Sequence, residues 1–83
     1  MDIKVYTLLN CSSCAHLKEL MTRANQTYTE TQIGTDITLE QFQQEHPGIN
    51  MLPYVIIDDE KIGGLIEVAR KFLKEGLVTP PQK

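Results

Sequence analysis

Cys11 and Cys14, the only two cysteines of the chain, lie three positions apart. An apolar run at residues 3–9 precedes them and predicts a strand, and apolar residues at helical spacing follow within 10–25. On a helix, both thiols lie within one turn, where a disulfide can open and close without dismantling the fold. The spacing therefore predicts redox chemistry at a point where a strand meets a helix.

The chain has 83 residues, of which 41% are hydrophobic, and this suffices for one small core. We expect a single domain over residues 1–83. Residues 1–4 lack the basic start of a signal peptide, and no apolar run is long enough to cross a membrane. These features predict a cytoplasmic protein without a membrane partner.

The charge of the chain argues against nucleic acid as a partner. The net charge is −3, and the eight lysines and arginines are scattered rather than clustered. Two cysteines are too few for a secreted disulfide scaffold, and in a reducing compartment a close pair marks a catalytic dithiol or a metal site. The choice between these two decides the function.

Four segments are predicted to be strands: residues 3–9, 27–33, 53–57 and 61–63. Residues 58–60 have turn composition, so the last two strands should form a hairpin. A right-handed crossover would make the first two strands parallel, and the hairpin would add antiparallel strands to the same sheet.

Three helices are predicted: within 10–25, from Thr38 to Pro47, and from Gly64 to Gly76. Thr38 and Gln41 have the spacing of a capping box. Residues 78–83 are expected to form a frayed tail. The element order β-α-β-α-β-β-α is that of the thioredoxin fold, an α/β class with a four-stranded mixed sheet flanked by helices.

The two thiols are predicted to have different roles. A thiolate attacks disulfides, and a helix N-terminus or a CxxC motif lowers a cysteine pKa from about 8.5 to about 3.5–7.5. Cys11 starts the helix, where unpaired N–H groups favour a negative sulfur. Cys14 lies one turn inward, where burial should keep its pKa higher. We therefore expect Cys11 to form a mixed disulfide and Cys14 to resolve it.

Lys18 shares a helix face with Cys14 and could favour a thiolate there, although a solvated lysine is the simpler interpretation. Metal and haem sites fit the spacing poorly. Ala15 stands where a c-type haem site needs histidine, and His16 and His46 are too far apart in sequence for a Cys₂His₂ zinc site.

Two further motifs reveal a family resemblance. One is the segment 51–55, with a proline at its centre, and the other is the glycine pair in segment 62–64. Together with the CxxC motif, they make the chain resemble the glutaredoxins, and especially the short glutaredoxin/thioredoxin-like proteins of phages. The resemblance covers nearly the whole chain and implies a four-stranded mixed sheet with helices on both faces.

The resemblance also implies substrate contacts. Pro53 would be the cis-proline of the family, facing the dithiol, and the backbone of Leu52 would pair with an extended substrate. The alternative is an ordinary trans-proline that begins an edge strand. Gly63-Gly64 would let a ligand approach closely, and the helix N-terminus at Leu65 and Ile66 would offer amides to a carboxylate of glutathione.

The chain departs from the family pattern at charged positions. Glutaredoxins usually carry aspartate shortly after the glycine pair, whereas here Leu65 and Ile66 follow it and the first acidic side chain is Glu67. They often carry lysine or arginine where this chain has Leu8. We therefore expect weaker glutathione binding and an apolar rim for a protein partner, made of Leu8, Leu9, Leu52 and Ile66. Alternatively, Leu8 and Leu9 simply end a buried strand.

Ser12 and Ser13 stand in place of the Pro-Tyr of the commonest glutaredoxin centre. Some glutaredoxins that lack this proline hold a [2Fe–2S] cluster between two subunits, bound by the first cysteine and glutathione, and this is the leading alternative. Otherwise, the two hydroxyls are expected to cap the helix or to donate to the thiolate and lower its pKa.

These features predict a monomeric, glutaredoxin-type thiol–disulfide oxidoreductase with no metal and no bound cofactor. Cys11 would reduce protein disulfides, and glutathione or a thioredoxin-reductase-like donor would regenerate the dithiol. By resemblance to the phage proteins, ribonucleotide reductase is an expected target. A cluster carrier and a non-enzymatic binding module on the same fold are the alternatives.

Overall fold

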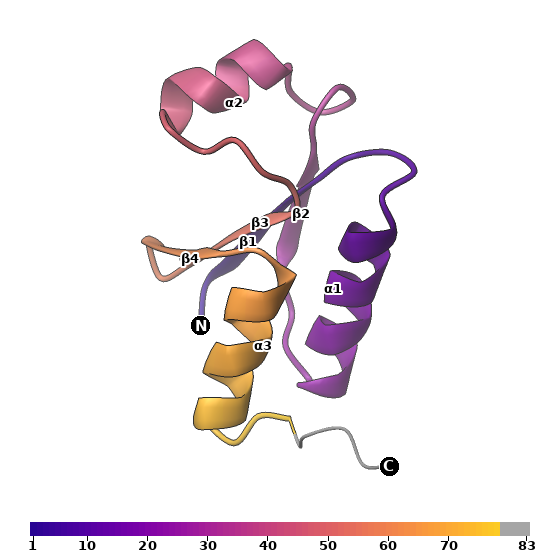
Figure 1. The fold of residues 1–83 in the computed structure, drawn as a ribbon, viewed down its shortest axis with the longest axis vertical. Coiled ribbons are helices and arrows are strands. Elements are labelled where there is room, and N and C mark those ends of the chain that lie inside the picture. The colour runs from indigo at the N-terminus through magenta and orange to yellow at the C-terminus, as the bar shows by residue number, and fades with distance from the viewer. Residues whose placement is uncertain (79–83) are drawn as a thin grey trace.

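The computed structural model describes residues 1–78, and none of their helices is long and apolar enough to cross a membrane. The predicted order of elements is confirmed (Figure 1). The elements are β1 (Ile3–Thr7), α1 (Ser12–Arg23), β2 (Thr29–Gln32), α2 (Leu39–Glu45), β3 (Tyr54–Ile57), β4 (Glu60–Gly63) and α3 (Leu65–Lys74).

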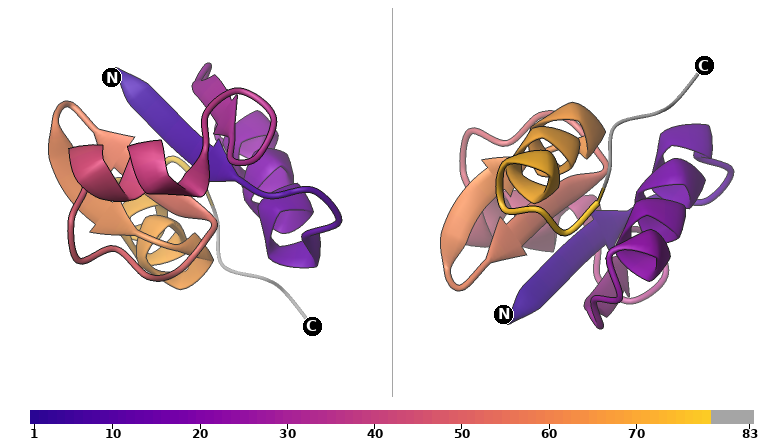
Figure 2. Two further views of the ribbon diagram at one scale, coloured as in Figure 1. Left: turned by 90° about the horizontal axis from the view of Figure 1, so that it is seen from above. Right: turned by 90° about the horizontal axis from the view of Figure 1, so that it is seen from below.

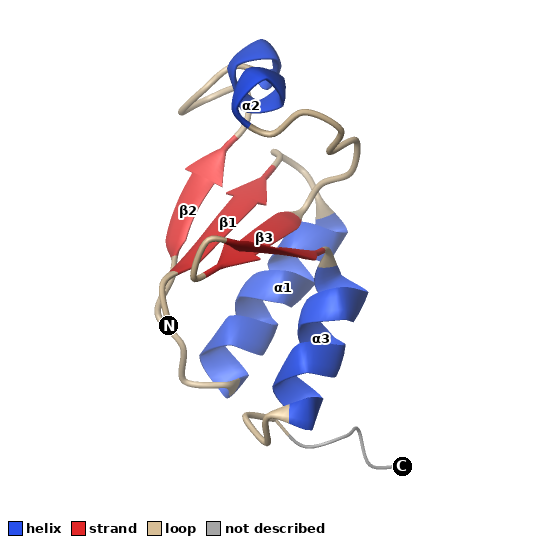
Figure 3. Cartoon of the chain, turned by 90° about the vertical axis from the view of Figure 1, so that its left-hand side faces the viewer, coloured by secondary structure: helices blue, strands red, loops and turns tan. Residues whose placement is uncertain are grey.

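The strands form one mixed sheet in the order β2-β1-β3-β4, and Figure 3 shows β2, β1 and β3 next to one another in this order. β1 and β2 are parallel, and β3 runs antiparallel to both β1 and β4, as predicted. Asp58 and Asp59 turn the hairpin with φ values of 51° and 65°, the left-handed conformations that short hairpin loops need. Glu60, expected in the turn, pairs instead with Ile57 in the sheet.

Helices cover both faces of the sheet. α1 and α3 lie side by side on one face and α2 lies on the other (Figures 2 and 3). The first core cluster fills the α1/α3 side and consists of Ile3, Val5, Leu17, Met21, Ala24, Val55, Ile57, Val68 and Phe72. The second core cluster lies under α2 and consists of Tyr6, Ile33, Phe42, Ile49 and Ile56.

The predicted end of the first strand is wrong by two residues. β1 stops at Thr7, whose carbonyl accepts the Ile33 N–H at 2.8 Å. Asn10 then takes a left-handed conformation, with φ 55°, just before α1 begins. Leu8 and Leu9 lie in this connection and are exposed, so they do not end a buried strand.

The predicted tail is contradicted at its first residue. Val78 is partly buried and packs against the first core cluster, because the chain turns back after α3 at Gly76, which has φ 75°. The rest of that prediction concerns residues 79–83, which lie outside the described residues.

One side chain anchors α2 to the sheet. The capping box begins the helix as predicted, with Gln41 N–H donating to Thr38 Oγ1 at 3.0 Å. Phe42 is the buried residue of this helix, and its ring lies 4.9 Å from that of Tyr6 and 5.4 Å from that of His46. A seven-residue helix is too short to be stable alone, so its position depends on this contact.

Replacing Phe42 with alanine should lower the free energy of unfolding by about 3–5 kcal/mol, because it leaves a cavity between α2 and the sheet. Urea denaturation followed by circular dichroism measures the change. Gln43→Ala, on the exposed side of the same helix, is the matched control and should cost less than about 0.5 kcal/mol. Similar small losses in both variants would contradict this role of Phe42.

Candidate active site

The sheet register brings the predicted motifs to one end of the molecule. Tyr6, near the end of β1, pairs with Tyr54 at the start of β3, and Val55 pairs with Gly63 at the end of β4. The cysteine segment follows β1, the proline precedes β3 and the glycine pair lies at the end of β4. Three segments that are distant in sequence therefore meet at the same edge of the sheet.

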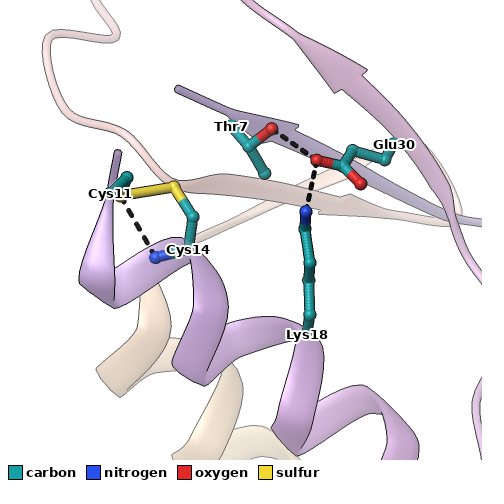
Figure 4. Close-up of a disulfide and its surroundings, with 5 residues drawn as sticks. All are labelled: Thr7, Cys11, Cys14, Lys18 and Glu30. Atoms are coloured by element: carbon teal, nitrogen blue, oxygen red, sulfur yellow. Dashed lines mark hydrogen bonds and ion pairs between the residues drawn. A yellow bond between two sulfur atoms is a disulfide. The ribbon is translucent and has the colours of Figure 1, made fainter. Parts of the chain in front are cut away.

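Cys11 is the N-cap of α1, as its predicted position at the helix start required, and it is disulfide-bonded to Cys14 (Figure 4). The Cys14 N–H donates to Cys11 Sγ at 3.1 Å, so the sulfur takes the place of a capping oxygen. Cys14 is 3% exposed, whereas Cys11 is only half-buried. Cys11 is therefore the more accessible of the two sulfur-bearing residues.

The two serines between the cysteines are exposed and lie in the first turn of α1. The expectation that their hydroxyls cap the helix is wrong, because Cys11 occupies the N-cap and its sulfur accepts the hydrogen bond. Donation from Ser12 or Ser13 to a Cys11 thiolate stays a prediction, since the pair is oxidised here.

The Leu52–Pro53 peptide bond is cis, which confirms the predicted geometry of this proline. Pro53 is buried, and Leu52 is half-buried because its side chain packs against the second core cluster. Leu52 therefore adds less to an exposed rim than expected. Its neighbour Met51 is 69% exposed and projects from the same loop. The contact of this loop with a substrate stays a prediction.

Other parts of the chain pack closely against the glycine pair. A Cβ on Gly63 would lie 2.8 Å from Cγ of Glu67, and a Cβ on Gly64 would lie 3.4 Å from the Pro53 carbonyl oxygen. Gly63 also has φ 129°, which disfavours any other residue. Glu67 and the proline loop thus lie close to the glycine pair, and the close approach of a ligand there stays a prediction.

Glu67 is a site residue that the sequence reasoning did not assign. Its Oε1 accepts the Gly64 N–H at 2.9 Å, so a carboxylate stands beside the start of α3. The signal in the sequence was an acidic residue at the third helical position, where capping boxes place one. Leu65 packs against the first core cluster, whereas Ile66 is 62% exposed.

Lys18 is not simply solvated. Its Nζ lies 2.7 Å from Glu30 Oε2 on β2, and the buried Thr7 donates its hydroxyl to the same oxygen at 2.7 Å (Figure 4). The hydrogen bond from Lys18 lowers the pKa of Glu30 most, and Thr7 lowers it further, against the opposing effect of burial. The carboxylate is therefore ionised at neutral pH.

Within residues 1–78, no three histidine, cysteine or acidic side chains gather to hold a metal ion. A cluster shared between two subunits would draw ligands from a second chain and from glutathione, so this observation does not address it. The absence of a metal and the iron–sulfur alternative both stay predictions.

No protein-family model matches the sequence. Glutaredoxin 1 of Rickettsia typhi is 33% identical over 64 residues, a match that covers 75% of this chain and 62% of that relative. This chain thus spans less than two thirds of the relative's length.

Solved structures with the same fold include a thioredoxin-like protein, 29% identical with a TM-score of 0.71, covering 87% of this chain and all of that one. Glutaredoxin 1 of Francisella tularensis is 27% identical with a TM-score of 0.71, covering 92% and 95% of the two chains. A buckwheat glutaredoxin–glutathione complex is 23% identical with a TM-score of 0.73, and the match covers 90% of this chain and 71% of that one. At this identity, the similarity supports a common fold only. The thioredoxin fold is therefore confirmed, and closeness to phage proteins stays a prediction.

After reduction, iodoacetamide should label Cys11 before Cys14, because Cys11 is half-buried at a helix N-terminus and Cys14 is buried. Brief labelling followed by peptide mass spectrometry gives the order, and labelling of the unfolded protein in urea is the control, in which the two rates should become similar. Faster labelling of Cys14 in the folded protein would reverse the roles.

Proposed function

We propose that this chain, which belongs to the glutaredoxin family of thioredoxin-fold proteins, is an enzyme that reduces protein disulfides. The cysteine pair and the glutaredoxin homologues support a glutaredoxin-like redox function. The single observation that carries the proposal is the asymmetry of the pair: one sulfur is accessible at a helix N-terminus and the other is buried one turn away. That asymmetry supports separate attacking and resolving roles.

In the proposed reaction, the Cys11 thiolate attacks one sulfur of a substrate disulfide and forms a mixed disulfide. The second substrate sulfur leaves and takes up a proton. Cys14 then loses its proton and attacks Cys11 Sγ, which releases the first substrate sulfur and closes the Cys11–Cys14 disulfide. Two electrons pass to the substrate, and a thiol reductant returns them by the reverse exchange.

We assign protein segments, in preference to glutathione, as the main substrates. Four large apolar side chains are exposed near the disulfide or in the segments that meet at its edge of the sheet: Leu8 (43%), Leu9 (66%), Met51 (69%) and Ile66 (62%). These four form the apolar rim as the structure revises it, with the exposed Met51 in place of the half-buried Leu52. An apolar segment beside a substrate disulfide would bury part of this rim, and its backbone would pair with that of Leu52.

Glutathione is the proposed reductant, with weaker binding than in glutaredoxins that carry more charge at this site. Leu8 offers no cation to a glutathione carboxylate, and the Glu67 carboxylate adds negative charge beside the first amides of α3, where such a carboxylate would bind. A thioredoxin-reductase-like donor is the other candidate. The proposed setting is the cytoplasm, with the protein as a monomer and ribonucleotide reductase among its targets.

Cys11→Ser should abolish disulfide reduction, whereas Cys14→Ser should accumulate mixed disulfides, because only the first variant lacks the attacking sulfur. Insulin reduction measures turnover, and intact mass spectrometry detects the adducts. Ser13→Ala, which changes an exposed residue between the cysteines, should form the same intramolecular disulfide as the natural chain and serves as control. Turnover by Cys11→Ser would disprove the assignment.

Leu9→Ser should raise KM for a protein disulfide about fivefold, as expected for the loss of about 1 kcal/mol of apolar contact. Hydroxyethyl disulfide, too small to reach the rim, should be reduced at the unchanged rate. Leu39→Ser is the matched control, because Leu39 is 51% exposed but lies at the start of α2. An equal effect of both variants, or an effect of Leu9→Ser on the small disulfide alone, would argue against the rim.

A further inference from the structure

We propose that the ion pair between Lys18 and Glu30 sets how readily the Cys11–Cys14 disulfide is reduced. Lys18 and Glu30 are positioning residues in this role, since they act on the sulfurs through charge and not through contact with a substrate. The inference rests on the proposed function, because it concerns the redox step of the same site.

The pair begins one helical turn away from the disulfide. Lys18 follows Cys14 by one helical turn, so the two side chains share a face of α1, with Cβ atoms about 5–6 Å apart. Figure 4 shows Lys18 extending from α1 to Glu30 on β2, on the turn of α1 that follows Cys14. Thr7, the last residue of β1, holds the same carboxylate oxygen from the sheet.

The contacts constrain both charges. The Glu30 and Lys18 side chains are 29% and 39% exposed, so solvent screens them less than it screens a fully exposed pair. Among the described residues, Lys18 is the charged side chain that forms an ion pair with Glu30. Because Glu30 Oε2 binds both Lys18 and Thr7, the ammonium is directed toward the sheet and its charge is largely compensated by the carboxylate.

Reduction changes the charge of the cysteine pair. The disulfide is neutral; on accepting two electrons from a dithiol reductant such as dithiothreitol, the S–S bond breaks and dithiothreitol closes to its cyclic disulfide. Of the two protons released by the reductant, Cys14 takes one, and the other goes to solvent when Cys11 stays a thiolate. A nearby positive charge therefore favours the reduced form, and a nearby negative charge favours the disulfide.

Single substitutions should thus act in opposite directions. Glu30→Gln keeps an oxygen that accepts from Thr7 but leaves the Lys18 charge uncompensated, which should raise the equilibrium constant for reduction about tenfold. Lys18→Met leaves the Glu30 charge uncompensated and should lower that constant about tenfold. For a two-electron couple, each change corresponds to about 30 mV. The double variant restores local neutrality and should lie close to the natural protein.

The experiment equilibrates each full-length variant with mixtures of reduced and oxidised dithiothreitol at pH 7. Acid then stops the exchange, and alkylation with mass spectrometry gives the reduced fraction. Thermal unfolding by circular dichroism checks that each variant is folded, and Lys18→Gln replaces Lys18→Met if the latter is not. The measurement needs no enzymatic turnover, so it can fail or succeed independently of the proposed function.

A second ion pair on the same helix supplies the matched control. Arg23 and Glu19 lie 2.9 Å apart on exposed side chains near the C-terminal end of α1, away from the disulfide. Arg23→Met and Glu19→Gln should each change the reduction equilibrium less than twofold. These variants test whether any loss of charge on this helix shifts the equilibrium.

Opposite shifts for the two single variants, cancelling in the double variant, would support the proposal. A purely structural role of the pair would instead loosen α1 in both variants and shift both equilibria in the same direction. Shifts of the same sign, or no shift in either folded variant, would overturn the proposal. Shifts of equal size in the control pair would overturn it as well.

Discussion

The candidate site depends on the N-cap of α1, where the side chain of Cys11 supplies a sulfur atom as the capping acceptor. Most helices use an oxygen to accept one of the free N–H groups of the first turn, whereas α1 uses Cys11 Sγ, which accepts from Cys14. The contact places Cys11 Sγ, the proposed attacking atom, where the helix dipole favours negative charge. It also fixes the second cysteine one turn inward, within the core side of the helix. The start of the helix and the position of the accessible sulfur therefore depend on the same contact.

Features that depend on local spacing were predictable from the sequence. The order of elements, the capping box of Thr38 and Gln41 and the position of Cys11 at a helix start follow from periodicity and from short motifs. The end of β1 was not predictable from the sequence, because Leu8 and Leu9 continue the apolar pattern of the strand. The strand ends where its pairing in the sheet ends.

Features that depend on tertiary contacts were harder to foresee. Lys18 and Glu30 are separated by a helix end and a turn, so nothing in their spacing indicates that they meet. The Glu67 side chain had the spacing of a cap, but its packing over Gly63 depends on how β4 enters α3. The sequence thus showed which charged residues lie near the site, but it did not show which groups they pair with. The resemblance to glutaredoxins supports the proposed reaction, whereas these pairs became visible only in the structure.

The packing of Glu67 over Gly63 couples the residue types that positions 63 and 67 can accept. Residue 63 has no space for a side chain while a longer side chain at 67 lies across it. A smaller side chain at 67 would relax the steric part of that constraint, although the positive φ at 63 would remain. The identity of residue 63 is therefore constrained by an internal neighbour as well as by its own backbone conformation.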